Sequence, residues 1–138
     1  MDSFVLGSGD GSARLEFSDL ERDHHGTADR LKATITDVGL VASARVVFNT
    51  HINDASALAT MFEEIAGQWR GWDGTRQWQA LESPFRLCFT HDGIGHIRAE
   101  VTLGSGFYPE DWSVKACLIL EPGALEELAP SFRRFLEQ

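Results

Sequence analysis

The sequence has few of the features that assign a chain to a specialised class of protein. Only two of the 138 residues are cysteine, and no apolar run approaches the roughly 20 residues needed to span a bilayer. The N-terminus, Met1-Asp2-Ser3-Phe4, lacks the basic start and apolar stretch of a signal peptide. We therefore expect residues 1–138 to form a single cytoplasmic domain, held by a hydrophobic core rather than by disulfides or a metal.

Basic residues are also scarce. The chain has 12 Lys and Arg against 21 Asp and Glu, which gives a formal net charge of -9. Such an excess opposes binding to nucleic acid, where Lys and Arg neutralise phosphates, and to anionic membranes. It is compatible with a cationic protein partner, although it can also serve only to keep a protein soluble. A homo-oligomer is a further option.

Alternating apolar residues predict a first set of strands at residues 13–18, 31–36 and 40–48. Between the last two, Gly39 can adopt the positive φ of a tight turn. A two-residue loop at Val38-Gly39 places the apolar residues of both strands on one face. This register pairs Ile35 with Ala42, Ala33 with Ala44 and Leu31 with Val46.

Two amphipathic helices are predicted from apolar residues at helical spacing. The first stripe begins at Leu58 and extends to Trp69, with Asn53 or Asp54 as the N-cap and an end near Gly71. The second occupies residues 125–136, where Pro130 should kink the helix or break it into two pieces.

A second set of strands is expected at residues 85–90, 97–103 and 112–121. The turn Asp92-Gly93-Ile94-Gly95 between the first two is a strong hairpin signal. Matching the apolar faces pairs Phe89 with Ala99 and Leu87 with Val101, and the odd loop length predicts a bulge at a glycine. The expected fold class is α+β, with a single antiparallel sheet built from two sets of meander strands and two helices.

These registers also predict the state of the two cysteines. Cys88 and Cys117 lie on strands that flank the strand at residues 97–103. Two inter-strand steps span roughly 9–10 Å, whereas a disulfide needs Cα atoms within about 7 Å. We therefore expect two free thiols.

The segment from Trp69 to Trp78 is the most distinctive in the chain, because it holds three of the four tryptophans. Trp and Arg are enriched at the energetic centres of protein interfaces and also form stacking platforms. The alternative is structural, with Trp69 continuing the helix stripe and Trp78 covering a sheet edge. The candidate partner-binding residues here are Arg70, Trp72, Asp73, Arg76 and Trp78.

His91, Asp92 and His96 bracket the predicted hairpin and complete the candidate site. Such a cluster could hold a cation or act as acid and base. The segment offers Thr90 but no Ser or Cys at a sharp turn to act as a nucleophile, and Asp92 is a common turn residue. Neighbouring histidines at His24 and His25 are best explained as a polar loop. We therefore predict no catalytic residues, metal or cofactor.

Several of these segments resemble a bacterial domain family of unknown function. That family is itself distantly similar to the wall-associated-protein immunity family, small cytoplasmic proteins that neutralise a toxin domain. The resemblance covers about the C-terminal two-thirds, and the Gly-His turn followed by an alternating strand is its most specific part. The residues that carry it are Trp69-Arg70-Gly71-Trp72-Asp73-Gly74, Trp78, Leu81-Glu82, Thr90-His91-Asp92-Gly93 and Gly95-His96-Ile97.

The leading interpretation is a non-catalytic protein-binding module of the immunity or antitoxin type, with a cationic, toxin-like partner. The immunity role is implied by the resemblance alone. The alternative is a small-molecule-binding or enzymatic domain that uses the region of Trp72, His91 and His96.

Overall fold

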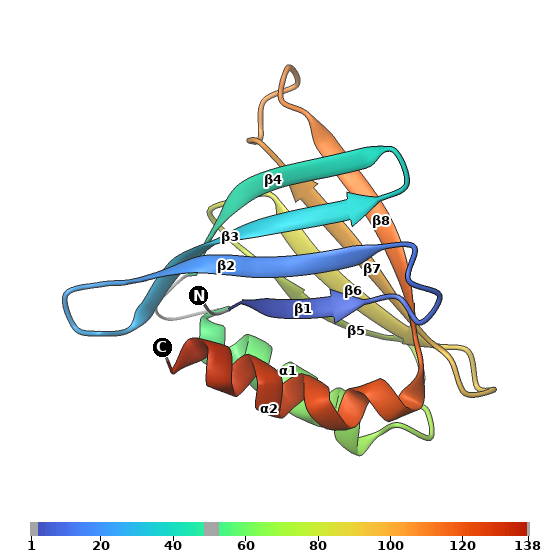
Figure 1. The fold of residues 1–138 in the computed structure, drawn as a ribbon. Helices are drawn as coiled ribbons and strands as arrows, with labels where there is room; N and C mark the ends of the chain where they lie inside the picture. The colour runs from blue at the N-terminus through green and yellow to red at the C-terminus, as the bar shows by residue number, and fades with distance from the viewer. Residues whose placement is uncertain (1–2, 49–52, 138) are drawn as a thin grey trace.

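The computed structural model describes residues 3–48 and 53–137, which form two antiparallel sheets and two helices (Figure 1). The strands of the first sheet lie in the order β1-β2-β3-β4, and those of the second in the order β5-β6-β7-β8. The elements are β1 (Phe4–Gly7), β2 (Arg14–Arg22), β3 (Ala28–Asp37), β4 (Leu40–Val47), α1 (Ala55–Gly67), β5 (Thr75–Gln79), β6 (Phe85–His91), β7 (Ile97–Gly104), β8 (Ser113–Leu120), a 3-10 turn (Pro122–Ala124) and α2 (Leu125–Leu136).

The α+β class is confirmed, but the expected single sheet is wrong. Each sheet has one apolar face, and two sheets bury these faces against each other, whereas two helices could not cover an eight-stranded sheet. The sheets contact each other through β4 and β7 and through β1 and β8. Near the second contact, the backbone N–H of Gly9, just after β1, donates to the carbonyl of Ile119 on β8 at 2.8 Å. The helices lie side by side, with α1 against β5 and α2 against β1 (Figure 1).

The predicted strand registers are confirmed in both hairpins. On β3 and β4, Ile35, Ala33 and Leu31 lie opposite Ala42, Ala44 and Val46. On β6 and β7, the pairs are Phe89 with Ala99 and Leu87 with Val101. The β6–β7 ladder keeps one register from Phe85 to His91, so the irregularity expected at a glycine is confined to the turn, where Gly93 and Gly95 both have positive φ.

The predictions for α1 are partly confirmed. Asp54 caps the helix, since its side chain accepts a hydrogen bond from the backbone N–H of Ala57 at 2.7 Å. The buried stripe, however, ends at Ile65. Trp69 lies beyond the helix and is 50% exposed, so the expectation that it continues the stripe is wrong.

The proline in the C-terminal segment does not break the helix. Pro130 lies within α2, which runs without interruption from Leu125 to Leu136. Proline cannot donate the backbone hydrogen bond of its turn. The buried face of the helix holds it in place nonetheless, through Leu125, Leu128, Ala129, Phe132 and Phe135.

An aromatic cluster ties the helices to the sheets. Phe4 of β1 lies 5.6 Å from Phe62 of α1 and 5.2 Å from Phe132 of α2, measured between ring centroids. Phe62 also packs edge-on against Phe89 of β6 at 6.1 Å. Because these contacts join both sheets and both helices, the described residues share one continuous core.

The cysteine prediction is confirmed. Cys88 and Cys117 are both free, and each lies opposite Glu100 on β7, one on either side of that strand. No helix in the described part of the chain is long and apolar enough to cross a bilayer.

Candidate functional site

All the candidate residues except Trp78 gather at one end of the second sheet. The connection from α1 to β5 supplies Arg70, Trp72 and Asp73, and Arg76 follows on β5. The β6–β7 hairpin supplies the three residues that complete the group, His91, Asp92 and His96. A shallow depression of about 480 Å³ lies between the two segments, lined by Gly71, Trp72, Asp73, His91, Asp92 and Gly93.

His91 braces the two segments against each other. Its Nδ1 accepts a hydrogen bond from the backbone N–H of Gly93 at 2.8 Å, so the ring carries its proton on Nε2. That Nε2–H donates to the carbonyl of Trp69 at 3.0 Å. Gly71 has a φ of +134°, and a Cβ at this position would lie 3.4 Å from His91 Nδ1. The imidazole is therefore committed to holding the connection between α1 and β5.

Trp72 covers the other side of this imidazole. The two rings meet edge to face, with centroids 5.4 Å apart. The guanidinium of Arg76 lies 5.8 Å from the Trp72 ring, within the range of a cation–π contact. Trp72 is half-buried, and its Nε1 is enclosed without a hydrogen-bond acceptor among the described residues. Buried donors usually have a hydrogen-bond partner, so this indole N–H is an exception in the described part of the chain.

Asp92 and His96 shape the hairpin turn. Asp92 Oδ1 accepts hydrogen bonds from the backbone N–H of Ile94 at 2.8 Å and of His96 at 3.0 Å. Its Oδ2 lies 3.1 Å from His96 Nδ1. These contacts, the His96 backbone N–H first among them, lower the pKa of Asp92 below its ordinary value. The carboxylate therefore serves the turn as a hydrogen-bond acceptor.

Trp78 belongs to the core and not to this surface. It is 4% exposed, and its ring lies 5.7 Å from that of Phe48 and 6.1 Å from that of Phe85. Its Nε1 donates to the carbonyl of Asp54 at 3.2 Å, which fastens the start of α1 to β5. A side chain buried in this way presents no surface to a partner.

Trp69, by contrast, extends the surface beyond the predicted residues. Its ring is half exposed, and the guanidinium of Arg70 lies 5.1 Å from the ring centroid. Beside it runs an apolar groove of about 210 Å³ lined by Ala66, Trp69, Gly123, Leu125 and Glu126. We call Trp69, Arg70, Trp72 and Arg76 the Trp/Arg surface.

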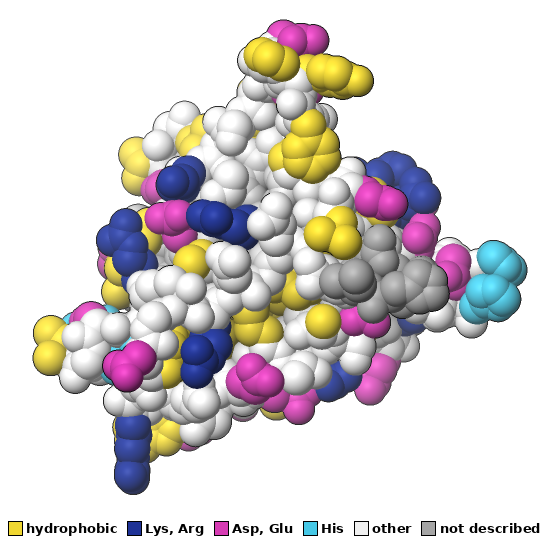
Figure 2. Space-filling view, turned by 180° about the vertical axis from the view of Figure 1, so that it is seen from behind, with side chains coloured by type: hydrophobic (Ala, Val, Ile, Leu, Met, Phe, Trp, Pro, Cys, Tyr) yellow, Lys and Arg dark blue, Asp and Glu magenta, His cyan; other side chains and the backbone are white. Residues whose placement is uncertain are grey.

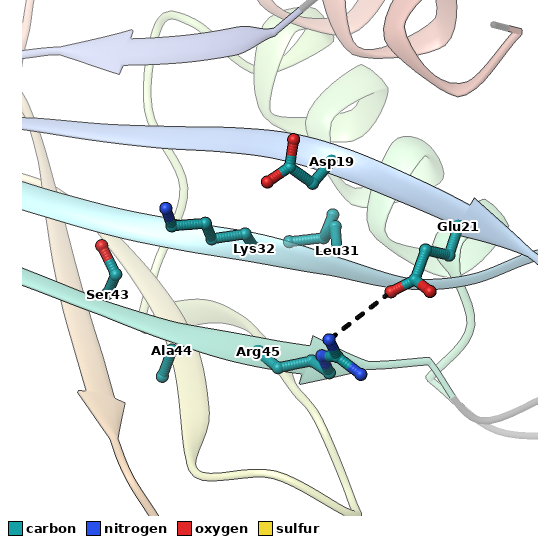
Figure 3. Close-up of a pocket in the computed structure, with 7 residues that line it drawn as sticks. All are labelled: Asp19, Glu21, Leu31, Lys32, Ser43, Ala44 and Arg45. Atoms are coloured by element: carbon teal, nitrogen blue, oxygen red, sulfur yellow. Dashed lines mark ion pairs between the residues drawn. The ribbon is translucent and has the colours of Figure 1, made fainter.

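A second depression, of about 270 Å³, lies on the first sheet (Figure 3). Asp19 lines it with a φ of +52°, at a point where the β2–β3 register shifts. Asp tolerates this left-handed conformation better than most residues. Glu21 and Arg45 form an exposed ion pair at 3.8 Å across one end, and Lys32 lies along the strand between β2 and β4. The mixed charges suit a zwitterionic or peptide contact, but they lie away from the Trp/Arg surface.

Sequence reasoning missed the aromatic loop at residues 105–112, between β7 and β8. Phe107, Tyr108 and Trp112 are 66%, 74% and 41% exposed. Asp111 orders the loop by accepting hydrogen bonds from the hydroxyl of Ser105 at 3.2 Å and the backbone N–H of Tyr108 at 3.0 Å. Three aromatic residues in a segment without alternation were the signal that could have identified it.

The side chains of the Trp/Arg surface have partly exposed rings that can stack and guanidinium groups that can donate hydrogen bonds. Among the described residues, no group of His, Cys, Asp and Glu is arranged to hold a metal ion. His91 is occupied by two backbone contacts, and His96 by Asp92.

Comparison with known proteins places the chain in one family. Residues 6–138 match the model of DUF6228, a family of unknown function. The match shows no link to the wall-associated-protein immunity family suggested by the sequence resemblance. No curated protein and no solved structure matches the chain.

Proposed function

The chain belongs to DUF6228, a family of unknown function, and we propose that it is a non-catalytic protein-binding module that uses the Trp/Arg surface. The observation that carries this proposal is the exposed Trp69 with Arg70 stacked on it, beside Trp72 and Arg76 in the same arrangement. Trp and Arg dominate the energetics of protein interfaces because they combine a large contact area with directional hydrogen bonds.

The rigidity of this surface supports the proposal. Ordering flexible side chains on binding costs roughly 0.5–1.5 kcal/mol for each one immobilised. Here the backbone beneath Trp69 is fixed by His91, and Trp72 is already half-buried against the same imidazole. A partner would therefore meet side chains that have lost much of their freedom during folding.

The charge around this surface favours a cationic partner. Asp73 and Asp92 line the depression beside Trp72, and Glu126 lines the groove beside Trp69. Carboxylates at the rim of an interface raise the association rate of a positively charged protein. An immunity-type protein that occludes a basic toxin domain would have this character, and that assignment rests on the sequence resemblance.

The experiment is affinity capture of partners from the cell that makes the protein, with three variants in parallel. Trp69→Ala and Arg70→Ala should lose a captured protein that the native chain retains, because each removes exposed contact area without touching the core. Val38→Ser, at an 88% exposed valine in the β3–β4 turn, is the matched control and should capture normally. Equal capture by all three variants, or no captured protein, would reject the proposal.

The alternative of a small-molecule or enzymatic site has one observation in its favour. Trp72, whose enclosed Nε1 has no acceptor among the described residues, lines the depression that also contains His91. A ligand with an acceptor atom could pair with that N–H. Native mass spectrometry of the purified protein would detect such a ligand, and Trp72→Phe, which keeps a ring but removes the N–H, should abolish its binding.

A further inference from the structure

The aromatic loop at residues 105–112 projects from the end of the second sheet opposite the Trp/Arg surface, since successive turns of a meander lie at opposite ends of their shared strand β7. In Figure 2 the projection at the top carries hydrophobic side chains and an acidic group at its tip. From their exposed fractions, Phe107, Tyr108 and Trp112 present on the order of 350 Å² of aromatic surface. The largest apolar patch on a typical monomer has about this size and often serves a function.

The loop is built to hold these rings in one conformation. Asp111 binds Ser105 and Tyr108 at the loop base, and the Ser105 hydroxyl accepts the backbone N–H of Trp112 at 3.1 Å. Gly106 lies so close to the Asp111 carboxylate that a Cβ at this position would collide with Oδ2. The exposed aromatics are therefore displayed on a defined scaffold and cannot easily fold back onto the protein.

A hollow of about 330 Å³ lies directly beside the projection, on the outer face of the second sheet. Phe107 lines it together with Arg86 and Lys115. The two cations share one carboxylate, because Arg86 lies 3.5 Å and Lys115 3.6 Å from Glu100 Oε1. The hollow thus carries an excess of one positive charge on a chain whose net charge is -9.

We propose that this surface pairs two copies of the chain about a two-fold axis, with the aromatic loop of each copy in the hollow of the other. A projection adjacent to a hollow is the arrangement that a two-fold interface needs, because the same patch must serve on both sides. The charges match as well, since Glu110 at the exposed tip has no ion-pair partner among the described residues and would meet the Arg86 and Lys115 cations.

The acidic tip and the cationic hollow favour a second copy over an unrelated protein. A foreign partner would need its own acidic projection and cationic hollow in the same spacing, whereas a second copy supplies both. The aromatic surface gives nearly half of the roughly 800 Å² that a stable interface buries on each partner, and the walls of the hollow supply more. The Trp/Arg surfaces would remain free at the outer ends of the dimer.

The test is sedimentation analysis of the purified full chain over a range of concentrations. The native protein should approach twice the chain mass of 15.3 kDa as the concentration rises. Phe107→Ser and Glu110→Lys should each weaken the dimer at least tenfold, because one removes the inserted ring and the other sets a cation against Arg86 and Lys115. Ile94→Ser, at an 80% exposed position in the β6–β7 turn, is the control and should dimerise normally.

Two outcomes would overturn the proposal. One is a native chain that stays monomeric up to about 1 mM, the concentration that would reveal a dimer held by a binding free energy of only roughly 4 kcal/mol. The other is a dimer that Phe107→Ser and Glu110→Lys leave as tight as Ile94→Ser does. Either result is independent of partner capture through Trp69, so failure of one proposal leaves the other standing.

Discussion

The role of His91 as a brace leads to a quantitative prediction. His91→Ala removes hydrogen bonds to Trp69 at 3.0 Å and from Gly93 at 2.8 Å, and it removes the edge-to-face contact with Trp72. Each hydrogen bond contributes about 1 kcal/mol net, and the aromatic contact about 0.5–1.5 kcal/mol. Because water can reach the freed backbone groups, we take the lower end and expect the free energy of unfolding to fall by about 2 kcal/mol.

His96 supplies the matched control, because it lies at the other end of the same turn. Within the described residues its side chain forms an ion pair with the exposed carboxylate of Asp92 at 3.1 Å, and exposed ion pairs contribute little to stability. Urea denaturation followed by tryptophan fluorescence should show a clearly larger fall in midpoint for His91→Ala than for His96→Ala. Equal midpoints would refute the brace and return His91 to the set of residues free to act on a ligand.

Three further changes test the core and the turn. Trp78→Phe keeps a buried ring but loses the hydrogen bond to Asp54, so urea denaturation should show a loss of about 1–2 kcal/mol. Phe132→Ala empties the centre of the aromatic cluster and should cost about 3–5 kcal/mol by the same measurement. The folded pKa of Asp92 lies below its unfolded value, so its stabilisation is present above about pH 4 and is lost as the pH falls through the folded pKa. Asp92→Asn should therefore lose less unfolding free energy than the native chain between pH 6 and pH 3. An equal loss in both proteins would contradict the lowered pKa of Asp92.

The parts of the fold that could be predicted are those with a strong local pattern. Alternation and a glycine turn fixed the β3–β4 register, and the same logic placed Cys88 and Cys117 on either side of β7. The edge strands β1 and β5 were missed because they are only four and five residues long. The division into two sheets was missed because the pairing patterns within each meander do not show whether a strand of the first meander pairs with a strand of the second.

The candidate site shows the same limit. The sequence singled out two segments that the structure places side by side, but it could not distinguish Trp69 from Trp78. The helical spacing of apolar residues extends past the end of α1, so Trp69 was expected to be buried, although it is half exposed. Trp78 lies on the short strand β5, which was not predicted, and its side chain points into the core. Which tryptophan is exposed depends on where a helix ends and a strand begins, and these boundaries are set by tertiary packing.

Salt separates the two proposed interactions because it acts on them with opposite sign. Two copies that each carry a net charge of -9 repel one another at long range, and this repulsion is screened as the Debye length falls from about 10 Å at 0.1 M salt to about 3 Å at 1 M. The close contact of Glu110 with the hollow is screened less, and burial of Phe107 does not weaken with salt. Added sodium chloride should therefore tighten the dimer. Attraction to a cationic partner at the acidic rim of the Trp/Arg surface is screened instead, so its association rate should fall. A dimer that loosens steadily with salt would mean that charge pairing, and not the aromatic loop, holds the two copies together.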